Sequence, residues 1–126
     1  MRSPSVMFVD DDPVETHPYE MYLKKAVPCD VVRAHSGEEA LDLAEAHSFD
    51  LVLLDAVMKP MDGFETCEAL RKMRRYRTTP IVILTKLLEG GADERRAMRV
   101  GASGYVHKPV KASELAALVK SILIQS

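Results

Sequence analysis

Short apolar runs alternate with longer segments of helical periodicity along the whole chain, and this alternation restricts the possible folds more than any other feature. The runs are residues 6–9, 31–34, 51–54, 81–84 and 104–106. Central strands that are apolar throughout are typical of a parallel sheet covered by helices on both faces. Because crossovers between parallel strands are right-handed, we predict an α/β fold: a (βα)5 doubly wound, five-stranded parallel sheet in a three-layer sandwich. Among doubly wound orders we expect 2-1-3-4-5.

The segments between the runs carry helix signals. Helices are predicted over residues 13–26, 36–47, 62–74 and 92–100, and again near the end of the chain, where Leu115, Leu118, Val119 and Ile122 form an apolar stripe. Ser36 precedes Glu39 by three residues, which is the spacing of a capping box, and Asp62 begins the next helix in the same way. Pro18 is expected to delay or kink the start of the first helix.

Size and charge exclude several classes of protein. The 126 residues fit one domain, so we expect a single domain over 1–126 and no output domain. A net charge of −2 gives no reason to expect nucleic acid or an anionic membrane as a partner. No apolar run is long enough to span a membrane, and the N-terminus lacks a secretion signal. Cys29 and Cys67 have no metal-binding spacing, so free, half-buried thiols in the cytoplasm are expected.

Acidic residues stand where two of the predicted strands end. Asp10 and Asp11, followed by Asp12, come directly after the first run, and Asp55 ends the third. The carboxyl ends of parallel strands meet at one edge of a sheet, where doubly wound folds bind ligands. Such a cluster repels itself unless a cation is present, and Mg²⁺ prefers oxygen ligands of this kind. The sequence therefore predicts a magnesium site at this edge, at which Mn²⁺ is also possible.

Two further polar residues are expected at the same edge. Thr85 ends the fourth run, and Lys108 follows the fifth. Each residue has an ordinary explanation when taken alone: Asp12 as a helix cap, Asp55 as a turn former, Thr85 as a strand end. Together, a carboxylate nucleophile beside a metal, an ammonium group and a hydroxyl indicate a reversible aspartyl-phosphate site.

The sequence resembles the receiver domain of two-component response regulators over essentially its whole length. The stretches that carry the resemblance are residues 9–13, 50–55, 61–65, 80–85 and 101–109, which are specific in this order and spacing. The resemblance implies a flavodoxin-like fold with Asp55 as the phosphoacceptor. It also implies that Asp10, Asp11, Asp55 and the main-chain carbonyl of Val57 hold Mg²⁺.

The resemblance assigns roles to four more residues. Thr85 and Lys108 would bind phosphoryl oxygens, and Tyr105 would be an aromatic switch that turns inward when Thr85 moves. The peptide bond between Lys108 and Pro109 would be cis. The phosphodonor would be a sensor histidine kinase or a histidine phosphotransfer protein. The output would be an unknown protein target or a homodimer formed through the fourth helix, fifth strand and fifth helix.

The chain departs from the family pattern near the predicted site. Lys59 stands where the family usually has proline, and Lys86 stands where it prefers a small residue. One extra residue is expected within 86–91. Because Val57 has no polar group to orient water and Lys86 could shield the site, we hypothesise slow self-dephosphorylation.

Other functions were weighed against this one. A Mg²⁺-dependent aspartyl-phosphate hydrolase would need an acid at Val57, and a nucleotide-binding flavodoxin-like protein would not place aspartates after its first strand. We therefore expect a signalling domain, not an enzyme beyond self-catalysed phosphotransfer and dephosphorylation. The alternative is a receiver fragment of a larger response regulator or hybrid histidine kinase. The basic cluster at 71–77 and the histidines, His107 included, are expected at the surface.

Overall fold

A computed structural model of the protein describes residues 3–86 and 89–124. Its sheet contains β1 (Ser5–Val9), β2 (Asp30–Ala34), β3 (Leu51–Asp55), β4 (Ile81–Lys86) and β5 (Gly104–Lys108). All neighbouring strands pair in parallel, in the order β2-β1-β3-β4-β5. The predicted fold class and strand order are confirmed.

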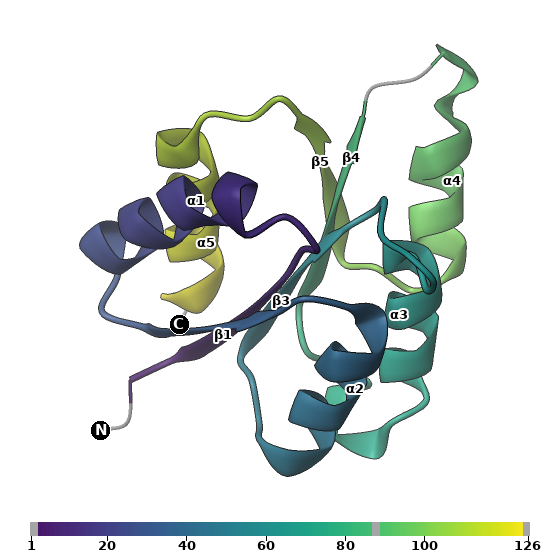
Figure 1. Ribbon diagram of the computed structural model, residues 1–126, viewed down its shortest axis with the longest axis horizontal. Helices are drawn as coiled ribbons and strands as arrows, with labels where there is room; N and C mark the ends of the chain where they lie inside the picture. Colours follow the sequence, from purple (N-terminus) through teal and green to yellow (C-terminus); the bar gives the residue numbers. More distant parts are fainter. Residues whose placement is uncertain (1–2, 87–88, 125–126) are drawn as a thin grey trace.

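The helices form the two outer layers. They are α1 (Pro13–Ala26), α2 (Gly37–Ala46), α3 (Gly63–Arg71), α4 (Ala92–Arg99) and α5 (Ala112–Leu123). One face of the sheet is covered by α1 and α5, which pack against each other, and the other face by α2, α3 and α4 (Figure 1). The first helix begins at Pro13, so Pro18 does not delay its start as expected. The third helix ends earlier than predicted and is followed by the 3-10 turn η1 (Arg74–Tyr76).

Two apolar layers hold the helices against the sheet. Successive strand residues point to opposite faces, so Met7 and Leu54 pack on the side of α2 and α3 while Phe8 and Leu53 pack toward α5. Every residue of β3 is buried. Burying the Asp55 carboxylate at the end of this strand costs desolvation free energy, so the charge needs nearby partners that offset this cost.

Two capping motifs fix the starts of α2 and α3. Asp62 and Glu65 form the full reciprocal box, with distances of 2.8 and 3.0 Å. At α2 only half of the predicted box forms, because the Glu39 carboxylate accepts the main-chain N–H of His35 instead of that of Ser36. A side chain at Gly63 would collide with the main-chain oxygen of Asp55, so glycine allows α3 to begin directly against the end of β3.

The basic cluster is more structural than predicted. The Arg71 guanidinium donates to the main-chain carbonyls of Tyr76 (2.6 Å), Thr79 (2.6 Å) and Gly101 (2.8 Å). Arg75 donates to carbonyls at the end of α2, including that of His47 at 3.0 Å. Arg75 is exposed and Arg71 partly exposed, as expected, but both also donate to carbonyls of turns and helix ends that need donors.

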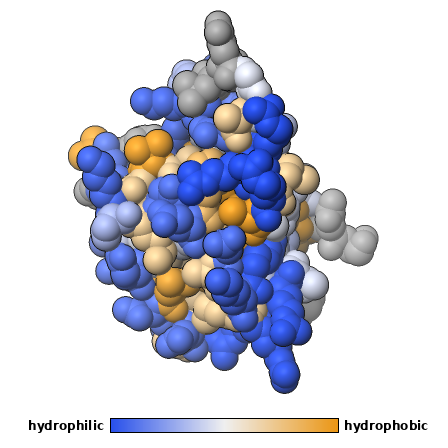
Figure 2. Space-filling model, turned by 90° about the vertical axis from the view of Figure 1, so that its right-hand side faces the viewer, coloured by the Kyte–Doolittle hydropathy of each residue, from blue (hydrophilic) through white to orange (hydrophobic). Residues whose placement is uncertain are grey.

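The face that carries α4 is mostly hydrophilic, with apolar residues in small separate patches (Figure 2). Within the described ranges, no helix combines the length and apolarity that crossing a lipid bilayer requires.

Both cysteines are free; Cys29 is half-buried, as expected, whereas Cys67 is fully buried.

Candidate functional site

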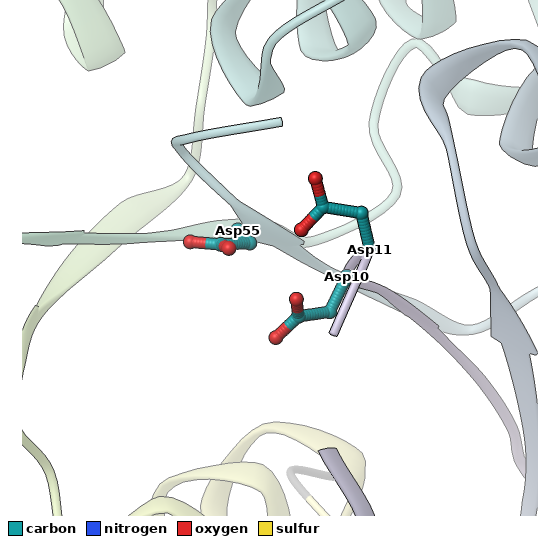
Figure 3. Close-up of side chains that lie close together, drawn as sticks. All are labelled: Asp10, Asp11 and Asp55. Atoms are coloured by element: carbon teal, nitrogen blue, oxygen red, sulfur yellow. The ribbon is translucent and has the colours of Figure 1, made fainter. Parts of the chain in front are cut away.

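Three aspartates meet at the carboxyl edge of the sheet. Asp10 and Asp11 come from the segment after β1 and lie beside Asp55 at the end of β3 (Figure 3). Each offers a carboxylate oxygen, and these oxygens all lie within 4.8 Å of one another. Asp10 and Asp55 are only 3% and 7% exposed, while Asp11 is exposed. The structure therefore brings together the acidic residues that the sequence placed at this edge.

Strand pairing explains why these residues converge. Val9 pairs with Leu54, so Asp10, directly after β1, and Asp55, the last residue of β3, lie side by side. The main-chain N–H of Asp10 donates to Ala34 at 3.0 Å, and Asp10 Oδ1 accepts the N–H of Asp12 at 2.8 Å. These bonds hold the acidic turn in place on the edge of the sheet.

Lys108 reaches the same cluster from the end of β5. Its Nζ lies 3.0 Å from Asp55 Oδ1, and both side chains are largely buried. An ammonium group in this position offsets part of the repulsion among the three carboxylates. Because Lys108 pairs with Lys86 in the sheet register, a second lysine ends the neighbouring strand.

A cavity of about 230 Å³ opens over the cluster. Its walls are Asp11, Asp12, Asp55, Val57, Leu84, Lys86 and Lys108. Acidic side chains thus face it from one side and two ammonium groups from the other. A larger cavity of about 430 Å³ lies near Asp30 and Phe49, away from this edge, and we base no site on it because size alone indicates no chemistry.

Thr85 lies near the end of β4 at the same sheet edge, but its hydroxyl contacts a residue of the neighbouring strand. It is 1% exposed and, among the described residues, is not part of the cavity wall. Its Oγ1 lies 3.3 Å from Nδ1 of His107, its partner in the β4–β5 register. His107 Nε2 in turn lies 3.2 Å from Oε1 of Glu94 on α4.

His107 is the residue that sequence reasoning missed. It was expected at the surface, but its side chain on β5 is only 33% exposed and contacts Thr85 on β4 and Glu94 on α4. The available signal was its position directly before Lys108, which pairs it with Thr85 once β4 and β5 are aligned. A titratable ring beside a predicted phosphoryl ligand is a candidate functional residue.

Comparison with known proteins identifies the chain. The family model for the response regulator receiver domain matches residues 6–120. The chain belongs to this family. It is 32% identical to the protein PilG of Pseudomonas aeruginosa, with 92% of this chain and 84% of that protein covered. The crystal structure of the chemotaxis protein CheY4 of Vibrio cholerae is 30% identical and superposes with a TM-score of 0.88, over 97% of this chain and 100% of that one.

Several relatives are longer than this receiver domain. The transcriptional regulatory protein YvrH of Bacillus subtilis is 34% identical, but the match covers 98% of this chain and only 50% of that protein. The chain therefore spans about half the length of several curated relatives that it matches. Domains of this family act in two-component phosphorelay signalling, and that is the coarse function of this chain.

The remaining predicted residues of the receiver domain can now be placed. Tyr105 is 40% exposed, with its ring against His107 at a centroid distance of 5.4 Å. The peptide bond between Lys108 and Pro109 is cis, as predicted, and the bond between Lys59 and Pro60 is cis as well. Val57 lines the cavity with an exposed side chain.

The departures from the family pattern lie around the cavity. Lys86 is part of its wall, whereas Lys59 is exposed and, within the described ranges, is not. The extra residue expected within 86–91 falls partly on 87 and 88, which lie outside the described residues. The rest of that segment contains Gly90 and Gly91, whose φ angles of 88° and 67° favour glycine.

Proposed function

We propose that this receiver domain accepts a phosphoryl group on Asp55. The observation that carries the proposal is the position of Asp55, between two further carboxylates and the ammonium group of Lys108 at the floor of an open cavity. A carboxylate in this position can act as a nucleophile toward phosphorus. The acyl phosphate that forms then lies beside the positive charge of Lys108.

The residues present fit a divalent metal. Asp10, Asp11, Asp55 and the main-chain carbonyl of Val57 would hold Mg²⁺, or Mn²⁺ in its place, because carboxylate and carbonyl oxygens are the donors that these hard ions take. When bound, the ion supplies positive charge that offsets the charge of an incoming phosphoryl group.

The chain's own residues carry out the transfer. An oxygen of the Asp55 carboxylate bonds to phosphorus while the bond from phosphorus to the donor's histidine nitrogen breaks, and that nitrogen keeps the electron pair. Lys108 then pairs with a phosphoryl oxygen instead of with Asp55 alone. The Thr85 hydroxyl binds another phosphoryl oxygen, and Tyr105 turns inward, which changes the surface formed by α4, β5 and α5.

The partners follow from this chemistry. The donor is a sensor histidine kinase or a histidine phosphotransfer protein, and the switched surface binds a downstream protein or a second copy of this chain. We propose a cytoplasmic signalling domain that does not itself bind nucleic acid and catalyses nothing beyond its own phosphotransfer and dephosphorylation. Because several relatives are about twice as long, the alternative is the receiver part of a larger regulator or hybrid kinase.

Incubation with acetyl phosphate and Mg²⁺, followed by intact mass measurement, tests the proposal. The wild-type protein should gain one phosphoryl group, and Asp55→Asn should gain none. Asp12→Asn is the matched control, because Asp12 lines the same cavity but lies outside the proposed metal ligands. Equal labelling of wild type and Asp55→Asn, or no labelling of wild type, would refute the assignment.

A further inference from the structure

The chain of contacts from Thr85 through His107 to Glu94 has a defined direction. The Glu94 carboxylate oxygen Oε1 lies 3.2 Å from His107 Nε2, an ion-pair distance, and its negative charge favours a ring proton on Nε2 over one on Nδ1. In the neutral ring, Nδ1 is then an acceptor. The Thr85 hydroxyl, 3.3 Å from Nδ1, therefore donates its single proton to His107.

That proton is the one that a phosphoryl group needs. Phosphoryl oxygens are acceptors, so Thr85 can bind one only by giving up His107. Thr85 is 1% exposed, which means that water does not readily replace the ring as its partner. The hydrogen bond thus stabilises the unphosphorylated arrangement, and its loss is part of the cost of activation.

We propose that His107 is a positioning residue that holds Thr85 away from the phosphoryl site until Asp55 is phosphorylated. This inference rests on the proposed function of Asp55. His107 lies against Tyr105, and its Nε2 lies 3.2 Å from Oε1 of Glu94 on α4, so release of Thr85 alters contacts of both β5 and α4. The three residues form a polar connection, a hydrogen bond between Thr85 and His107 and an ion-pair contact between His107 and Glu94, that runs from the phosphoryl site to the surface expected to change.

Glu94 makes the connection specific. Its side chain is 16% exposed, and its Oε2 is buried with no hydrogen-bond partner among the described residues. His107 Nε2 is the cationic or N–H group that the structure places beside this carboxylate, and that proximity favours the tautomer with its proton on Nε2.

Three substitutions separate the two contacts of the ring. His107→Asn places an amide acceptor near the position of Nδ1 and cannot reach Glu94. His107→Gln reaches toward Glu94 and leaves Thr85 without its acceptor. His107→Val removes both contacts and suits a strand. The readout is the concentration of beryllofluoride, a phosphoryl mimic, that half-saturates the protein with Mg²⁺, followed by amide NMR.

The Gln and Val variants should saturate at beryllofluoride concentrations about two- to tenfold below wild type, the equivalent of one hydrogen bond between uncharged groups, and Asn should stay close to wild type. Nitrogen NMR of the wild-type ring should show the proton on Nε2 and a bare Nδ1, with the Nδ1 signal changing on saturation. If Val does not fold, the comparison of Asn with Gln decides.

Equal midpoints for all variants, or a proton on Nδ1 of the neutral ring in the free protein, would overturn the role of His107. In either case wild type still binds the mimic, so the assignment of Asp55 survives. Failure of wild type to bind beryllofluoride or to be phosphorylated would instead remove the proposed function, and the role of His107 with it.

Discussion

Lys108 Nζ lies 3.0 Å from Asp55 Oδ1, although the two residues are 53 positions apart in the chain. The pair joins the ends of β3 and β5 across β4, and its ammonium group offsets part of the repulsion among the three carboxylates. Its consequences can be measured separately for stability and for phosphorylation.

Replacement of Lys108 by Met should affect both properties. With the ammonium group gone, phosphorylation of Asp55 by acetyl phosphate should slow by about a hundredfold, because a group that stabilises the transferring phosphoryl oxygens is lost. The free energy of unfolding in urea without metal should fall by about 2 kcal/mol, since a largely buried carboxylate loses a charged donor. Lys86→Met is the control: Lys86 lines the cavity but is exposed, so stability should hold. Unchanged phosphorylation in Lys108→Met would contradict the assignment.

Removal of one carboxylate should have opposite effects with and without metal. Asp10→Asn relieves repulsion among Asp10, Asp11 and Asp55, so the metal-free variant should melt at a higher temperature than wild type. Saturating Mg²⁺ should raise the melting temperature of wild type, because a ligand at about 100 times its dissociation constant adds about 2.7 kcal/mol. The variant should show little of this increase. Asp12→Asn should respond to Mg²⁺ like wild type; a full response in Asp10→Asn would exclude the proposed ligand set.

Topology made part of the site predictable from the sequence. Asp10 follows β1, and Asp55 and Lys108 end β3 and β5 of the same parallel sheet, so their convergence follows once the strand order is known. The direction of the Thr85 side chain did not follow, because it depends on the β4–β5 register that sets Thr85 opposite His107. The role of Arg71 could not be predicted from the sequence for a similar reason, because one of its acceptors is the carbonyl of Gly101, 30 residues away in the chain.

Burial of Cys67 should make the free energy of unfolding fall as the pH rises through the alkaline range. Burial raises the pKa of the thiol from 9.0 to about 11, although the nearby Arg71 charge lowers it. A raised pKa means that the unfolded chain loses the proton first, so stability is fully present below about pH 9 and falls as pH rises toward 11. Burial also raises the pKa of Tyr76, which acts in the same direction.

Urea unfolding at pH 8 and pH 10 measures this effect. Wild type should lose more stability between the two values than Cys67→Ala, by about 1–2 kcal/mol. Cys29→Ala is the matched control, because Cys29 is only half-buried and should remove less of the pH dependence. The same loss in wild type and Cys67→Ala would show that the thiol does not titrate as its burial requires.

The last prediction concerns how long the phosphorylated state persists. Val57 offers no polar group to orient water over the cavity, and Lys86 forms part of its wall. The phosphorylated wild type should therefore lose its phosphoryl group slowly, and Lys86→Ala should lose it several times faster, because water gains access from that side. Lys59→Ala provides the comparison, since within the described ranges Lys59 is exposed and apart from the cavity wall. The decay is followed by intact mass after removal of acetyl phosphate. Equal decay in wild type and Lys86→Ala would leave Val57 alone to account for a slow rate, whereas fast decay in wild type would contradict the hypothesis for both residues.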